Sequence, residues 1–97
     1  MLDKKIKDML KELYELYDLA YQSLSPQVAY IIKNSIKDNK LLESTLDELL
    51  NIPTDKCYKL FTELCGYISK FNSDMANDYL KIYEEMYGEE KPKKKTI

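Results

Sequence analysis

Histidine, arginine and tryptophan are absent from this chain of 97 residues, and all 15 basic residues are lysines. Histidine carries out most proton transfer near neutral pH, so its absence removes the commonest general acid and base. The absence of arginine removes the side chain that binds carboxylates, phosphates and guanine bases through two parallel hydrogen bonds. A conventional catalytic site and a specific nucleic-acid interface are therefore both difficult to build from this composition.

Glycine, cysteine and long hydrophobic runs are also scarce. Two glycines are too few for the many tight turns of a β protein. Apolar runs are short, so we expect no membrane span, and the amphipathic N-terminal residues predict no secretory signal and a cytoplasmic location. Cys57 and Cys65, eight positions apart on a predicted helix, lie about 12 Å apart along its axis, which is too far for a disulfide. We expect two buried free thiols, no metal site and no cofactor.

The composition that remains is that of one globular domain, with 44% apolar and 33% charged residues and a net charge of −2. Residues 1–88 hold eleven lysines against fifteen acidic residues, a balance of −4, which repels polyanions. We assign them to a single helical domain. Residues 89–97 are highly charged, contain Pro92 and lack periodicity, so we expect a flexible basic tail.

Apolar residues recur at spacings of three and four in residues 2–23, which predicts a first helix. Its apolar face is about 160° wide, more than one neighbouring helix covers. The members are Leu2, Ile6, Met9, Leu10, Leu13, Tyr14, Leu16, Tyr17, Ala20 and Tyr21. Ser25-Pro26 has the pattern of a cap followed by proline at the first helical position. It predicts a second helix that ends near Asp38-Asn39.

Three further helices are expected in the rest of the domain. Overlapping capping boxes at Ser44 and Thr45 predict the start of a short helix that Pro53 ends. Thr54 then caps a helix over residues 54–71. The poor helix formers Asn72-Ser73-Asp74 predict a break and a new cap before a last helix that ends at Gly88. Because the three-four spacing continues across that break, one rod over residues 54–87 stays an alternative.

The predicted fold is therefore all-α, a compact bundle of four or five helices with short connections. Its most deeply buried residues are predicted to be Leu13, Leu16, Ile32, Phe61, Leu64 and Ile68. We expect no enzymatic activity and no small-molecule substrate, because no nucleophile has a partner base and there is no glycine-rich phosphate loop. Acidic pairs such as Glu84-Glu85 point to different sides of a helix.

The two helices joined at residues 51–54 loosely resemble a helix-turn-helix motif, which makes a DNA-binding regulator using residues 44–64 the alternative function. Only Lys56 and Lys59 would reach a groove, and the domain is net negative. Phosphate attraction supplies most non-specific DNA affinity, so we do not expect nucleic-acid binding.

Tyrosine is the residue with most scope for function, with nine copies in the chain. Tyrosines supply large, rigid contact area at protein interfaces. We predict a partner-binding surface made of Leu10, Tyr14, Tyr17, Tyr21, Tyr30, Tyr83 and Tyr87. In a small bundle the ladder Tyr79, Tyr83 and Tyr87 also has a simpler interpretation, as packing at the edge of the core.

The predicted function is that of a small non-enzymatic interaction protein that occupies a surface on a larger partner or on a second copy of itself. Its size and helical build are similar to those of small phage or mobile-element accessory proteins and of bacteriocin immunity proteins, but no motif aligns with either. We expect a homodimer, or a hetero-complex in its place, through the wide apolar face of the first helix.

Overall fold

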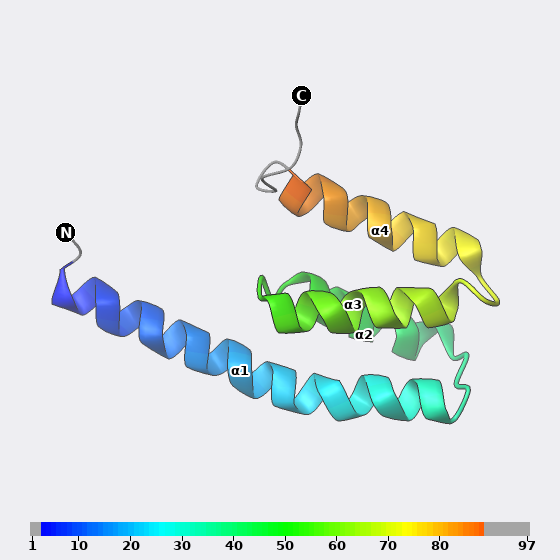
Figure 1. The fold of residues 1–97 in the computed structure, drawn as a ribbon, viewed down its shortest axis with the longest axis horizontal. Helices are drawn as coiled ribbons and strands as arrows, with labels where there is room; N and C mark the ends of the chain where they lie inside the picture. The colour runs from blue at the N-terminus through cyan, green and yellow to red at the C-terminus, as the bar shows by residue number, and fades with distance from the viewer. Residues whose placement is uncertain (1–2, 89–97) are drawn as a thin grey trace.

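The computed structural model describes residues 3–88, which form four α-helices and no strand (Figure 1). The helices are α1 (Lys4–Lys33), α2 (Asn39–Leu50), α3 (Asp55–Ile68) and α4 (Ser73–Tyr87). The structure is 84% helical, which confirms the all-α prediction. Leu2 and the predicted tail at residues 89–97 lie outside the described residues.

The predicted break at Ser25-Pro26 is wrong, because α1 is one continuous helix of 30 residues with Pro26 inside it. A proline inside a helix lacks the N–H for one backbone hydrogen bond and costs about 3 kcal/mol. Pro26 is exposed, whereas Leu24 and Val28 on either side of it are buried. Packing on both sides therefore holds the helix together across the proline, and α1 bends near its middle (Figure 1).

The predicted boundary between the second and third helices is also wrong. The first helix ends at Lys33, where Ser35 takes a left-handed backbone conformation with φ of 54°. Asp38 then caps α2, its side chain accepting a hydrogen bond from the Lys40 backbone N–H at 3.0 Å. Since Asp38 provides the cap, Ser44 and Thr45 lie inside the helix and their hydroxyls donate to the Leu41 carbonyl.

The predicted caps of the last two helices are confirmed. The Thr54 side chain accepts a hydrogen bond from the Cys57 backbone N–H at 3.3 Å, and that of Asn72 accepts from Met75 at 3.1 Å. Residues 54–87 therefore form two helices, not one rod. The first of them ends at Ile68, three residues earlier than predicted.

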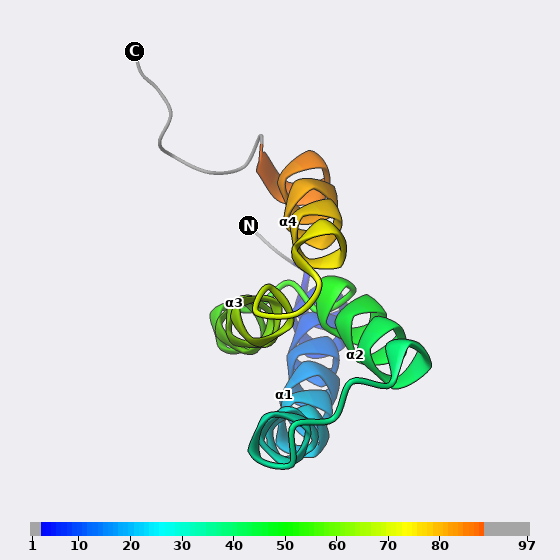
Figure 2. The same cartoon turned by 90° about the vertical axis from the view of Figure 1, so that its right-hand side faces the viewer.

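The core lies around α3, which packs against α1, α2 and α4. Figure 2 shows α2 and α3 between α1 on one side and α4 on the other. Of the predicted core residues, Phe61, Leu64 and Ile68 are fully buried and Ile32 is half-buried. Leu13 and Leu16 are 39% and 61% exposed, so their assignment to the core is wrong. The part of α1 that carries them extends past the ends of α2 and α3 (Figure 1).

Candidate protein-binding surface

A single apolar stripe runs along α1 with a spacing of three or four residues throughout. Its members are Ile6, Leu10, Leu13, Tyr17, Ala20, Leu24, Val28 and Ile31. Leu24, Val28 and Ile31 are buried against the other helices, and Tyr17 and Ala20 are half-buried. Beyond them the stripe is uncovered, and Ile6 is 45% exposed. The face that forms the core in the second half of α1 thus continues without cover in the first half.

The cause is a mismatch of helix lengths. With 30 residues α1 is about 45 Å long, whereas the 12 residues of α2 span about 18 Å and the 14 of α3 about 21 Å. Every residue from Asp3 to Leu16 is exposed. We call residues 4–16 the arm. Figure 1 shows it, in blue, extending beyond the bundle.

The arm carries more apolar area than the stripe alone. Met9, Tyr14 and Leu16 flank the stripe and are 60–62% exposed, and Leu19 just beyond the arm is 60% exposed. Single apolar residues on a surface are ordinary, but a contiguous apolar patch marks an interaction site in a soluble protein.

A tyrosine-lined groove lies at the base of the arm, where α1 passes the first turn of α3. The groove has a volume of about 200 Å³. It is lined by Tyr14, Tyr17, Asp18, Tyr21, Thr54, Asp55 and Lys56. The rings of Tyr14 and Tyr17 meet edge to face with centroids 6.0 Å apart, and the Lys56 ammonium lies 5.3 Å from the Tyr21 ring centroid.

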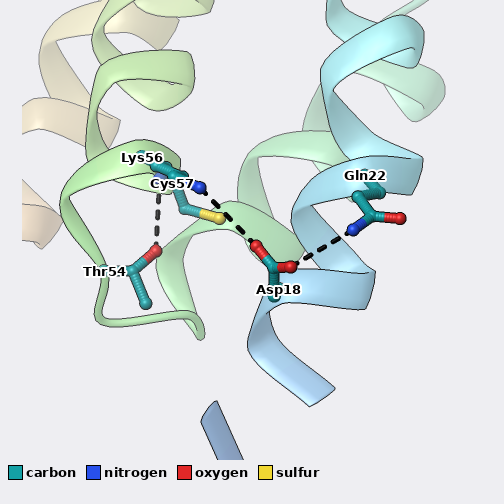
Figure 3. A network of polar contacts seen from close by, with 5 residues as sticks. All are labelled: Asp18, Gln22, Thr54, Lys56 and Cys57. Atoms are coloured by element: carbon teal, nitrogen blue, oxygen red, sulfur yellow. Dashed lines mark hydrogen bonds and ion pairs between the residues drawn. The ribbon is translucent and has the colours of Figure 1, made fainter. Parts of the chain in front are cut away.

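Polar contacts join the base of the arm to α3 (Figure 3). The Asp18 carboxylate lies 3.6 Å from the Lys56 ammonium and accepts a hydrogen bond from the Gln22 amide at 3.2 Å. Both charged side chains are more than half exposed, so the pair stabilises the fold by at most about 1 kcal/mol. These contacts orient the groove but bury none of the arm.

The predicted partner-binding residues fall into three places. Leu10 and Tyr14 lie on the arm, and Tyr17 and Tyr21 lie half-buried in the groove, so these four are brought together. Tyr30 is 61% exposed but lies sixteen residues, about 24 Å, along α1 from Tyr14. Leu13 and Leu16, which periodicity predicts to be core residues, are exposed, and so is Leu19, which no predicted surface includes. Only the lengths of the neighbouring helices distinguish an uncovered stripe from a buried one.

The remaining two predicted residues, Tyr83 and Tyr87, are half-buried where α4 meets α2 and α3. The Tyr83 ring centroid lies 5.2 Å from that of Phe61 and 4.9 Å from that of Tyr58. The Tyr87 hydroxyl donates a hydrogen bond to the Leu50 carbonyl at 2.6 Å. Both side chains therefore contribute to the attachment of α4.

Tyr79 also joins α4 to α2, because its hydroxyl donates to the Asp47 carboxylate at 2.9 Å. Burial, together with this hydrogen bond, raises the pKa of Tyr79 from its ordinary value of 10.0 to about 12. A folded-state pKa above the unfolded one means that the unfolded chain loses this proton first. The resulting stabilisation is fully present below about pH 10 and is lost as the pH rises through about 12.

We therefore expect Tyr79→Phe to make the free energy of unfolding less dependent on pH between about pH 10 and pH 12. Urea unfolding at a series of alkaline pH values measures this slope. Tyr30→Phe is the matched control, because Tyr30 is exposed and its hydroxyl makes no hydrogen bond among those identified in the described residues. Equal slopes for Tyr79→Phe and the parent would contradict the expectation.

Cys57 and Cys65 are both buried free thiols, as predicted. Burial raises the pKa of the Cys65 thiol to about 12, which keeps it protonated at neutral pH. Within residues 3–88, no three metal-ligating side chains are grouped so that they could hold a metal ion. The same residues contain no helix with the length and apolar character needed to cross a membrane.

No protein-family model matches this sequence, and comparisons with curated proteins and with solved structures found no significant similarity.

Proposed function

We propose that this chain is a non-enzymatic binding module of the cytoplasm, and that its arm and the adjoining tyrosine groove bind another protein chain. The observation that carries the proposal is the apolar stripe of α1, which is core in one half of the helix and uncovered in the other. A bound protein would continue over the arm the packing that α2 and α3 provide for Leu24, Val28 and Ile31.

The composition of the surface supports a protein as the ligand. Apolar side chains at intervals of three, four and seven along an exposed helix are the anchors of helix-mediated recognition. Tyr14 and Tyr17 add aromatic contact area with a hydroxyl that tolerates water, and aromatic residues are enriched in protein interfaces. An anionic membrane surface is a poorer fit, because Glu12, Glu15 and Asp18 offset the positive charge of residues 4–11.

The DNA-binding alternative gains no support from the arrangement of its helices. The would-be recognition helix, α3, packs against three other helices, which restricts the face that it could present to a groove. Its two lysines are balanced by Asp55 and Glu63, and Lys56 already pairs with Asp18. We therefore retain the protein-binding function.

A matched pair of double variants tests the proposal. Leu13→Glu with Leu16→Glu places two charges on the arm, whereas Leu80→Glu with Met86→Glu places two on exposed apolar positions of α4. The four side chains are 39–61% exposed, so neither variant buries a charge. We expect tagged parent and α4 variant to capture the same partner from the cells that express the chain, and the arm variant to lose it.

The measurement is quantitative recovery of the partner on the tagged chain, with far-UV circular dichroism to verify that each variant is folded. Undiminished capture by a folded arm variant would refute the proposal. Loss of capture by the α4 variant alone would move the binding surface to α4.

A further inference from the structure

We infer that the partner of the arm is a second copy of this chain, with the two arms packed side by side in antiparallel orientation about a two-fold axis. The inference rests on the proposed function and specifies its partner. Three features of the arm lead to it: the spacing of its apolar residues, the order of its charges along the helix, and the composition of its first turn.

The apolar spacing is that of a helix that pairs with another helix. Ile6, Met9, Leu13, Leu16 and Ala20 alternate intervals of three and four, which is two heptads of a coiled-coil seam. The first four of these side chains are 39–62% exposed. The seam is continuous with the buried stripe of α1, so a second arm would extend the existing helix packing rather than create a separate interface.

The charges along the helix favour an antiparallel partner of the same sequence. Residues 4–11 contain four lysines and one aspartate, a net charge of +3, and residues 12–18 contain Glu12, Glu15 and Asp18, a net charge of −3. An antiparallel pair with its two-fold axis near residues 8–9 places Glu12, at the start of the acidic segment, beside the lysines in the first turn of the other copy. A parallel pair would place like charges together, which disfavours it.

On one flank of the seam, two residues of opposite charge can pair between the two copies. Lys5 and Glu12 are seven residues apart, so they differ by only about 20° around the helix axis and border the same side of the seam. A two-fold axis between them brings Lys5 of each arm opposite Glu12 of the other, and each contact therefore occurs twice. Lys11 and Glu15 lie on the opposite, solvent-facing side of the helix.

The first turn of α1 is poorly stabilised on its own. Asp3 occupies the N-cap position without a side-chain hydrogen bond, and the first turn has no acidic residue. Lys4 and Lys5 instead place positive charge at the positive end of the helix dipole, which is unfavourable. In the antiparallel pair Glu12 of the other copy lies beside these lysines and offsets that repulsion.

Sedimentation equilibrium of the full chain and four variants tests the inference. The parent should dimerise at micromolar concentrations, and the dimer should weaken as salt is added. Lys5→Glu or Glu12→Lys alone turns two attractive contacts into two repulsive ones and should raise the dimer Kd about tenfold. The double variant Lys5→Glu/Glu12→Lys should restore the parent Kd, because the swapped charges again face each other. Lys11→Glu/Glu15→Lys, the matched charge swap on the solvent side, should leave the Kd within about twofold.

Two results would overturn the inference. One is a parent chain that remains monomeric at high micromolar concentration. The other is a Lys5→Glu/Glu12→Lys variant that dimerises no better than the single variants, which would exclude the antiparallel register. A monomeric parent that still captures another protein through the arm would leave the proposed function in place, whereas arm-independent capture would refute the proposed function without bearing on the dimer.

Discussion

Phe61→Ala is expected to destabilise the fold by about 3–5 kcal/mol, enough to unfold a marginally stable domain. Phe61 is fully buried in the middle of α3, the helix that contacts the other three, and its ring also meets that of Tyr83 at 5.2 Å. Removing the ring would leave a cavity inside the buried core, next to Tyr83 of α4.

The free energy of unfolding measured in urea tests this expectation. Tyr30→Ala provides the control, because Tyr30 is also an aromatic residue on a helix but is 61% exposed, and its loss should cost less than about 0.5 kcal/mol. If Phe61→Ala unfolds at the same urea concentration as the parent, the core does not centre on α3.

Deleting residues 1–16 should leave the stability of the fold almost unchanged and abolish binding. No side chain from Asp3 to Leu16 is buried, so the truncated chain keeps every buried residue of the core. We expect the free energy of unfolding to change by no more than about 1 kcal/mol. The capture of a partner and any self-association should both disappear, because the exposed apolar residues of the arm, and Tyr14 of the groove with them, are removed.

Thermal and urea unfolding measure the first half of that expectation, and sedimentation together with partner capture measures the second. A truncated chain that no longer folds would show that the arm is part of the core. A truncated chain that folds and still binds would show that the arm is not the interface.

Local signals in the sequence predicted much of the fold. The Thr54 and Asn72 caps form hydrogen bonds within one turn, and the inner face of α3 follows from periodicity, so Phe61, Leu64 and Ile68 were placed correctly. The helix boundaries predicted at Pro26 and at Ser44 are wrong because a second, stronger signal acts at each place. Packing of Leu24 and Val28 outweighed the proline, and Asp38 capped α2 before Ser44 could.

The candidate surface was only partly predictable for a different reason. Periodicity predicted that the first helix has more apolar surface than a small bundle covers, and it identified Leu10, Tyr14, Tyr17 and Tyr21. It could not say which part of that surface is left uncovered, because this depends on where α2 and α3 end. Leu13 and Leu16 belong to the same face as Leu24 and Ile31, and only the tertiary structure separates the exposed pair from the buried pair.

Amide hydrogen exchange of the free, dilute chain measures whether the arm is uncovered, because it reports for each residue whether neighbouring helices stabilise it. We expect residues 4–16 to exchange through local fraying, with protection far below that of residues 57–68 in α3, and protection in α1 to rise from about Ala20 onward. Protection of the arm equal to that of α3 in the dilute chain would mean that the arm is already covered within one molecule, and that it offers no free surface to a partner.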